Sequence, residues 1–345
     1  MTKRIVICCD GTWNIPDQPN PTNVVKLARA ILPEARDGTC QVVFYDAGVR
    51  TGGLLDHIRG GAFGKGILKN IEDSYRFLMH NYSPGDQVFL FGFSRGAYTA
   101  RSTVGLIRNC GLLEKEHADR FQDAIALYRH RVEGPDSPRS IEFRNRYSRE
   151  IEIDFLGVWD TVGALGIPAR GLNRLTRKRH QFHDVRLTRI VRRGYQALAI
   201  DERRFAFRPS IWEAKPREGQ TVEQVWFAGS HSDVGGGYRT AGLAGVASNW
   251  MVQKAEDAGL EFDAEYIAAN VQPAALDYLH DSRTSFYRLS PPHTREIAGN
   301  EATNEAVHPA AVSRFETAAP SYKPSNLQEY LADPTHAIAD VRDSW

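Results

Sequence analysis

Three residue types that together support nucleophilic catalysis occur along the chain in the order serine, aspartate, histidine. Ser94 lies in the pentapeptide 92–96 (GFSRG), while Asp160 and His231 each come shortly after the end of a predicted strand. A serine nucleophile needs a base to accept its proton and an acid to hold that base in the right tautomer. Ser94, Asp160 and His231 are therefore the predicted nucleophile, acid and base of an acyl-transfer site.

The segment around Ser94 has the composition of a sharp strand-to-helix turn. An apolar run, Val88–Phe91, precedes the turn, and apolar or small residues recur at helical spacing over 97–107. The glycines on either side of the serine keep side chains away from the crossing strand and helix. The helix N-terminus favours negative charge near the hydroxyl. Strand, turn and helix are the context of a nucleophile elbow in an α/β-hydrolase arrangement. The alternative is an ordinary turn that holds a serine.

The acid and the base each have rivals in the sequence. Asp160 could instead cap a helix after its strand, because aspartate is a favoured N-cap. His231 precedes a glycine-rich turn that lets its ring reach inward, and the alternative is a structural histidine. Asp233 is a second candidate acid and His308 a second candidate base. In α/β-hydrolases the acid and then the base follow the serine along the chain, each after a strand. This order favours Asp160 as the acid and His231 as the base.

Backbone donors must also stabilise the tetrahedral intermediate. One predicted donor is the N–H group of Arg95, directly after the nucleophile. The second is expected from the loop after the first strand, where Gly11 or Thr12 fits. Asp10 is unsuited to this role because a carboxylate repels the developing charge. It is expected to orient the loop by hydrogen bonds or to bind a cation.

The elements that must position these residues alternate between strand and helix. Predicted strands are Arg4–Cys9, Gln41–Tyr45, Val88–Phe91, Ile151–Trp159 and Val222–Phe227, and predicted helices are Asn23–Leu32, Ile67–Met79, 97–107, Lys115–Tyr128 and Leu243–Ala258. Residues 47–66 are expected to form a loop, and 194–207 to be helical. This order predicts an α/β fold, with a mostly parallel sheet covered by helices on both faces. We expect one domain over 1–345, with a core at about 4–260 and a helical or irregular extension at 261–345.

The overall composition is that of a globular protein. Of 345 residues, 42% are hydrophobic and 25% charged, and the net charge of +1 gives no field that favours nucleic acid. The four cysteines lack metal-type spacing, so no metal centre or cofactor is predicted, and free thiols suit a reducing compartment. No signal peptide or membrane-spanning run is apparent. The expected location is cytoplasmic, unless a dedicated machine exports the protein.

A strongly basic segment, Arg170–Arg193, contains nine Lys or Arg residues and one acid, Asp184. One interpretation is a solvated helical surface. The other is a lid or rim that makes peripheral contact with anionic groups such as lipid phosphates. The two interpretations remain open at the level of sequence.

Several ordered motifs resemble one known family. They are CDGTWN, GFSRGAYTAR, FLGVWDTVGALG, ALAIDERR and WFAGSHSDVGGGY, which together run from about Arg4 to about Tyr238. These motifs resemble the α/β-hydrolase catalytic domain of bacterial type VI secretion lipase effectors, which also occurs in short standalone proteins long filed as a domain of unknown function. The resemblance implies a serine hydrolase of esters, with phospholipase activity in the effectors and a lipid or other ester as substrate. It carries over Ser94 as nucleophile and points to Asp160 and His231.

Two other classes of function stay open. One is a metal-dependent phosphoester hydrolase that uses Asp10 and Asp233, because oxygen ligands at strand ends suit Mg²⁺. The other is a non-catalytic binding module that has kept the fold. Metal dependence of the activity, and its survival without the Ser94 hydroxyl, would separate these classes from a serine hydrolase.

Overall fold

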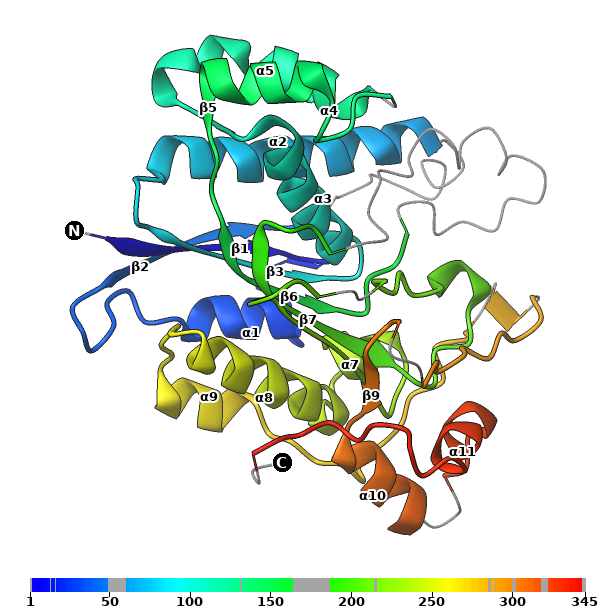
Figure 1. Ribbon diagram of the computed structural model, residues 1–345. Coiled ribbons are helices and arrows are strands. Elements are labelled where there is room, and N and C mark those ends of the chain that lie inside the picture. The colour runs from blue at the N-terminus through cyan, green and yellow to red at the C-terminus, as the bar shows by residue number, and fades with distance from the viewer. Residues whose placement is uncertain are drawn as a thin grey trace.

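Seven strands within the described residues form one parallel sheet, in the order β2-β1-β3-β6-β7-β8-β9 (Figure 1). The computed structural model describes residues 2–12, 14–15, 17–48, 60–130, 132–163, 187–213, 216–284, 287–288, 290–299, 302–317 and 322–342. The sheet strands are β1 Lys3–Cys9, β2 Cys40–Asp46, β3 Gln87–Phe93, β6 Ile153–Trp159, β7 Val191–Ala199, β8 Thr221–Phe227 and β9 Glu305–Val307. A separate antiparallel pair is formed by β4 Leu112–Leu113 and β5 Ser148–Arg149.

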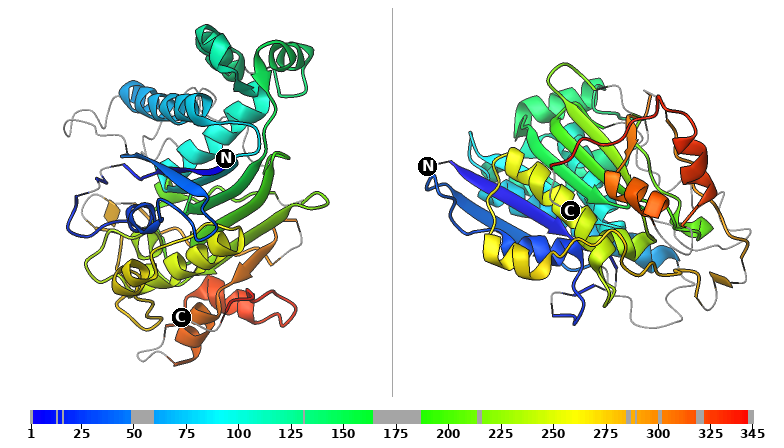
Figure 2. Two further views of the ribbon diagram at one scale, coloured as in Figure 1. Left: turned by 90° about the vertical axis from the view of Figure 1, so that its left-hand side faces the viewer. Right: turned by 90° about the horizontal axis from the view of Figure 1, so that it is seen from below.

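Helices cover both faces of this sheet, as Figures 1 and 2 show, which confirms the predicted α/β fold class. The helices are α1 Asn23–Ala30, α2 Gly60–Asn81, α3 Arg95–Cys110, η2 Lys115–Arg120, α4 Phe121–Arg129, α5 Pro138–Tyr147, η3 Phe205–Phe207, α7 His231–Gly235, α8 Gly242–Asp257, α9 Ala264–Asn270, α10 Pro309–Thr317 and α11 Ser325–Leu331. Helices α2 and α3 bury one apolar cluster against the sheet, and α1 and α8 bury a second on the other face. Within the described residues, no helix combines the length and apolar character needed to span a bilayer.

The register of the strands brings several strand ends to one edge of the sheet. Cys9 of β1 pairs with Gly92 of β3, and Phe93 pairs with Trp159 of β6. Because all these strands are parallel, the residues that directly follow them meet at the same edge. Asp10, Ser94 and Asp160 are those residues, which is how segments far apart in the sequence come to share one site.

The prediction of a helix over 194–207 is wrong. Val191–Ala199 forms the strand β7, which pairs with β6 and β8. Its sequence is rich in small residues that suit a helix, but strand pairing on both sides decides the conformation. A central strand is buried on both faces, so its apolar residues do not alternate with polar ones. Tyr195 and Ala197 enter one apolar cluster, while Leu198 enters another.

Three further expectations are modified by the structure. The loop expected over 47–66 ends earlier, since α2 begins at Gly60. The single helix expected over 115–128 is broken at His117, where the 3₁₀ helix η2 precedes α4. Of the basic segment Arg170–Arg193, residues 170–186 lie outside the described residues, and the remainder leads into β7.

The C-terminal part of the chain packs on the β8 side of the sheet and supplies its last strand. β9 pairs in parallel with β8, and α10 and α11 lie beside it (Figure 1). Trp226 of β8, Val307 of β9 and Leu327 of α11 share one buried apolar cluster. This packing carries the coil before β9 toward the edge of the sheet where Asp160 lies.

Candidate active site

Ser94 occupies a strained turn between β3 and α3. Its backbone has φ +58° and ψ −119°, a left-handed φ that a non-glycine residue rarely adopts. The turn is held because the Ser94 N–H group donates to the Trp159 carbonyl at 3.0 Å. A Cβ atom at Gly92 would lie 2.6 Å from the Gly96 carbonyl oxygen, and one at Gly96 would lie 2.2 Å from that of Cys9. Both glycines are therefore required for the close crossing of strand and helix.

We expect Gly96→Ala to destabilise the protein by about 1–3 kcal/mol, because the new methyl group meets rigid backbone of β1 rather than a movable side chain. Gly134→Ala is the matched control, since a Cβ atom there has no atom within 4 Å. Urea unfolding of both variants measures the free energy of unfolding. Equal midpoints for Gly96→Ala and wild type would contradict the packing described at the turn.

His231 bridges the serine and the aspartate. Its Nε2 lies 2.8 Å from Ser94 Oγ, and its Nδ1 lies 2.5 Å from Asp160 Oδ2. An ionised carboxylate can only accept a hydrogen bond, so the imidazole proton belongs on Nδ1. Nε2 then accepts from the Ser94 hydroxyl. The three residues predicted from the sequence thus lie together, in the order that proton transfer from the serine requires.

The site is buried and its electrostatics are set by burial and nearby charges. Asp160 is fully buried, which by itself raises its pKa, but the Arg295 guanidinium and the His231 hydrogen bond hold that pKa well below its usual value. Burial lowers the pKa of His231, and Asp160 opposes this shift only in part. Rings of Phe93 and Phe207 pack on the imidazole, with centroids 4.6 and 4.9 Å away. The lowered pKa favours the neutral imidazole, which is the form that can accept a proton.

Asp160 shares the backbone strain of the nucleophile. It has φ +39°, and within the described residues Asn304 is the one other non-glycine residue besides Ser94 with positive φ. Its N–H group donates to the Ala197 carbonyl at 2.7 Å, which fixes the turn after β6. Strained residues of this kind concentrate at functional sites.

Three charged residues at the site were missed by the sequence analysis. Arg295 donates to both carboxylate oxygens of Asp160, from Nη1 at 2.6 Å and from Nη2 at 3.0 Å. Glu202 accepts from the His231 N–H group at 3.3 Å and from Arg204 through both carboxylate oxygens. Glu202 and Arg204 belong to the motif ALAIDERR, so the family resemblance could have pointed to them. Arg295 belongs to none of the quoted motifs.

The loop after β1 lies against the nucleophile, as expected for an oxyanion site. A Cβ atom on Gly11 would come within 3.3 Å of the Ser94 Cβ atom. The Gly11 N–H group, however, donates to Asp10 Oδ1 at 2.6 Å. Thr12 is buried, and its hydroxyl has no hydrogen-bond partner among the described residues. In this loop the Gly11 N–H group is thus engaged by Asp10, while the Thr12 hydroxyl is unpaired among the described residues, and Arg95 begins α3 directly after the nucleophile.

Asp10 orients this loop through hydrogen bonds, one of the two roles considered for it. Its Oδ2 accepts from the hydroxyls of Thr22 at 2.7 Å and Tyr45 at 2.8 Å, and its Oδ1 accepts from Asn14 at 3.3 Å. These donors link the end of β1 to β2 and to the start of α1. Burial raises the pKa of Asp10, against the effect of these hydrogen bonds.

The two rival residues have other partners. Asp233 accepts from the N–H and hydroxyl groups of Ser230 and from His280 Nδ1 at 2.6 Å, which caps α7. Neither Asp233 nor Asp10 belongs to a cluster of three potential metal ligands in the described part of the chain. His308 stacks on Phe227 and its Nδ1 accepts from the N–H group at the second residue of α10. Burial lowers the pKa of His308 to about 3.

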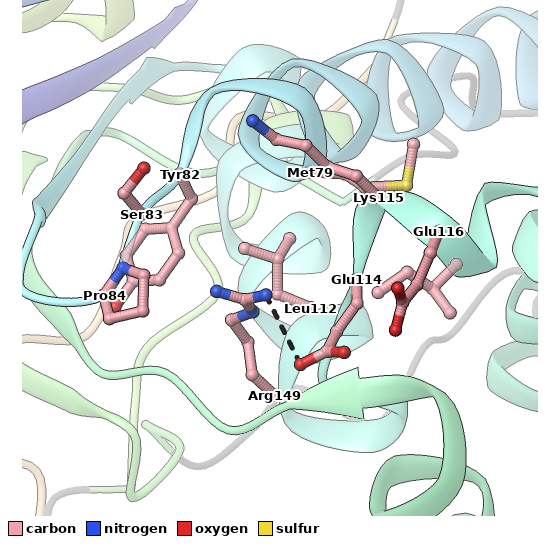
Figure 3. Close-up of a pocket in the computed structure, with 10 residues that line it drawn as sticks. Met79, Tyr82, Ser83, Pro84, Leu112, Glu114, Lys115, Glu116 and Arg149 are labelled. Carbon is pink, nitrogen blue, oxygen red and sulfur yellow. Dashed lines mark hydrogen bonds and ion pairs between the residues drawn. The ribbon is translucent and has the colours of Figure 1, made fainter.

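A cavity of about 280 Å³ lies elsewhere, between the end of α2 and the β4–β5 pair (Figure 3). Its lining residues are Met79, Tyr82, Ser83, Pro84, Leu112, Leu113, Glu114, Lys115, Glu116 and Arg149. Arg149 donates to Glu114 at 3.3 Å, as the dashed line in Figure 3 marks. The lining contains no histidine that could activate a serine, so this cavity is not a second site of the same kind.

The chain is similar to several known proteins. The chain is 30% identical over 239 residues to the uncharacterized protein YEL023C of Saccharomyces cerevisiae. This alignment covers 62% of the chain and 33% of the yeast protein. An uncharacterized Pseudomonas aeruginosa protein of known structure aligns with TM-score 0.46 and 19% identity, over 79% of this chain and 49% of that one. The Tle1 effector, solved bound to the VgrG spike of a type VI secretion system, aligns with TM-score 0.42 and 19% identity, over 70% and 52%. The chain thus spans about one third to one half of the length of these relatives.

The family comparison covers most of the chain and all three residues of the predicted triad. Residues 3–254 match the family model described as the catalytic domain of Tle1-like phospholipase effectors of the type VI secretion system. The match begins at β1 and ends within α8, so it includes the turn at Ser94, the strand end at Asp160 and the start of α7 at His231. The chain belongs to the family of Tle1-like phospholipase effector catalytic domains.

Proposed function

We propose that this protein is a serine hydrolase that cleaves carboxylic esters of lipids through an acyl-enzyme on Ser94. Membership of a phospholipase catalytic-domain family supports hydrolysis of the lipase or phospholipase class. The observation that carries the mechanism is the hydrogen-bonded chain from Ser94 Oγ through His231 to Asp160, with distances of 2.8 and 2.5 Å. Such a chain, with the serine on a strained turn, is the arrangement that activates a hydroxyl as a nucleophile.

Acylation begins with attack of Ser94 Oγ on the ester carbonyl carbon. The hydroxyl proton passes to His231 Nε2, and the carbonyl electron pair moves to oxygen, which becomes an oxyanion. Asp160 stays ionised and stabilises the imidazolium that forms. When the carbon–oxygen bond to the alcohol breaks, Nε2 gives its proton to the leaving oxygen. The acyl group is then bound to Ser94 and His231 is neutral again.

Deacylation repeats these steps with water in place of the serine. His231 Nε2 takes a proton from the water as its oxygen attacks the acyl carbon. Collapse of the second tetrahedral intermediate returns the proton to Ser94 Oγ and releases the carboxylic acid. One ester bond and one water are consumed, and one acid and one alcohol are formed.

We propose that the Thr12 hydroxyl, which is unpaired among the described residues, donates to the oxyanion in place of the backbone N–H group. Thr12→Val is then expected to lower kcat by about a hundred-fold, because it removes this hydroxyl while keeping the shape of the side chain. Thr103→Val is the matched control, since this buried hydroxyl donates to the Thr99 carbonyl within α3. Steady-state kinetics on an activated ester, with circular dichroism to check the fold, measures both. Equal kcat values for Thr12→Val and Thr103→Val would remove the Thr12 hydroxyl from the proposed oxyanion site.

Hydrolysis of two substrate series tests the proposed function. One series is p-nitrophenyl esters of graded chain length, and the other is phosphatidylcholine vesicles, both with and without EDTA. Preference for long chains and release of fatty acid from vesicles is the expected result. Preference for short chains, with intact vesicles, would indicate a carboxylesterase. Release of the phosphorylated or free head group in place of fatty acid, abolished by EDTA, would instead favour a metal-dependent phosphoester hydrolase, and no turnover of either series would favour a binding module.

A further inference from the structure

Arg295 is more deeply integrated in the site than an ordinary surface cation would be. Its side chain is 1% exposed, and besides Asp160 it donates to the carbonyls of Ala199 at 2.8 Å and Phe207 at 2.5 Å. Ala199 ends β7, and Phe207 packs its ring on His231. The Arg295 carbonyl itself accepts from Asn326 at 3.0 Å, at the start of α11. One guanidinium therefore hydrogen-bonds to the Asp160 carboxylate, to the end of β7 and to the residue whose ring packs on His231.

Arg295 comes from outside the part of the chain that matches the family. The match ends at residue 254, and Arg295 lies in the coil between α9 and β9. The C-terminal segment that packs beside β8 thus contributes a buried charge to a triad whose three members all come from the matched part. An arginine that binds both oxygens of the triad acid is not needed to orient the histidine, because the hydrogen bond from the acid to Nδ1 does that.

The charges around His231 show what this arginine does. Within the described residues, two carboxylates accept hydrogen bonds from His231: Asp160 from the imidazole Nδ1 and Glu202 from the backbone N–H group. Each carboxylate accepts hydrogen bonds through both oxygens from one guanidinium, Asp160 from Arg295 and Glu202 from Arg204. The charges of these four side chains sum to zero beside a neutral His231. Without Arg295 the same buried group would carry one net negative charge, which favours uptake of a proton.

We propose that Arg295 is a positioning residue of this site, which holds both oxygens of Asp160 in place and balances its charge so that His231 stays neutral and can accept the Ser94 proton. The inference rests on the proposed function for its catalytic meaning. The charge balance itself is a property of the folded protein, whatever its substrate. It predicts that loss of the arginine makes the histidine–aspartate pair take up a proton at higher pH, whichever of the two groups binds it.

The test is a pH titration of His231 by NMR in protein carrying labelled histidine, in a Ser94→Ala background that needs no substrate. The His231 signal is assigned by its loss in His231→Gln. In Arg295→Met we expect the titration midpoint to rise by about one to two pH units, the size expected when an opposite charge within a few ångströms is removed. Arg295→Lys, which keeps the charge, is expected to restore most of the difference.

Arg314→Met is the matched control. Arg314 is also buried in the C-terminal segment, its Nη1 also donates to two carbonyls, and its Nε, like that of Arg295, has no partner among the described residues. Its loss should weaken folding and leave the His231 titration unchanged. If Arg295→Met does not fold, Arg295→Gln is compared with Arg295→Lys in its place.

Two outcomes would overturn the proposal. One is an unchanged His231 midpoint in folded Arg295→Met or Arg295→Gln, and the other is an equal rise in Arg314→Met. In active protein, the acidic limb of the kcat/KM profile should move upward with the NMR midpoint in Arg295→Met. If the midpoint moves and wild type hydrolyses no ester, the proposed function fails while the role of Arg295 in the charge balance stands.

Discussion

Ser94→Ala is expected to lower kcat by about a thousand-fold or more on any ester that wild type hydrolyses. The Oγ atom forms the covalent bond to the acyl group, so no neighbouring side chain can replace it. KM should change little, because alanine leaves the walls of the site intact. The strained backbone at residue 94 is kept by the crossing of β3 and α3, so the variant should fold. Steady-state kinetics on p-nitrophenyl esters, beside circular dichroism, measures the effect.

Ser102→Ala is the matched control for this loss. Ser102 is also buried and lies on the same helix, two turns after the nucleophile. Its removal should leave kcat within a few-fold of wild type. Comparable activity of Ser94→Ala and wild type would show that Ser94 is a structural turn residue, and attention would move to the metal-dependent and binding alternatives.

His231→Gln is expected to cause a loss of the same order, because the hydroxyl proton then has no acceptor at 2.8 Å. Residues that act as a unit are not additive, so the double variant Ser94→Ala/His231→Gln should lose no more than either single variant. The acidic limb of the pH profile should also disappear from the residual activity. In wild type this limb should lie below the ordinary histidine range, because burial lowers the pKa of His231.

The rival base supplies the control for the histidine. His308→Gln removes an imidazole that is stacked on Phe227 and accepts a backbone hydrogen bond at the start of α10. It should lower stability and leave the pH dependence of kcat/KM as in wild type. Additive losses in the double variant, or a loss in His308→Gln as large as in His231→Gln, would contradict the assignment of His231 as base.

The parts of this site that were predictable from sequence have local causes. The turn at Ser94 follows from the steric need for glycines at a strand–helix crossing, which fixes the spacing in the sequence. Asp160 and His231 were predicted because parallel strands place the segments that follow them at one edge of the sheet. β7 was misread because a strand buried on both faces carries no alternation.

Other features depend on contacts between distant segments, and no local pattern encodes them. Arg295 reaches Asp160 across 135 residues of sequence, from a coil without periodicity. The choice between Gly11 and Thr12 depends on the direction of the Asp10 carboxylate, which the hydroxyls of Thr22 and Tyr45 determine. Composition and spacing cannot supply such side-chain orientations.

The most direct test of the central claim is covalent labelling of the native protein with a fluorophosphonate, followed by peptide mass spectrometry. This reagent reacts with a serine only where a base and an oxyanion site activate it, and it needs no knowledge of the natural ester. We predict one adduct, on the peptide that carries Ser94, absent in Ser94→Ala and formed far more slowly in His231→Gln. An adduct on another residue, or none on folded wild-type protein, would contradict the account of Ser94, His231 and Asp160 as a catalytic unit.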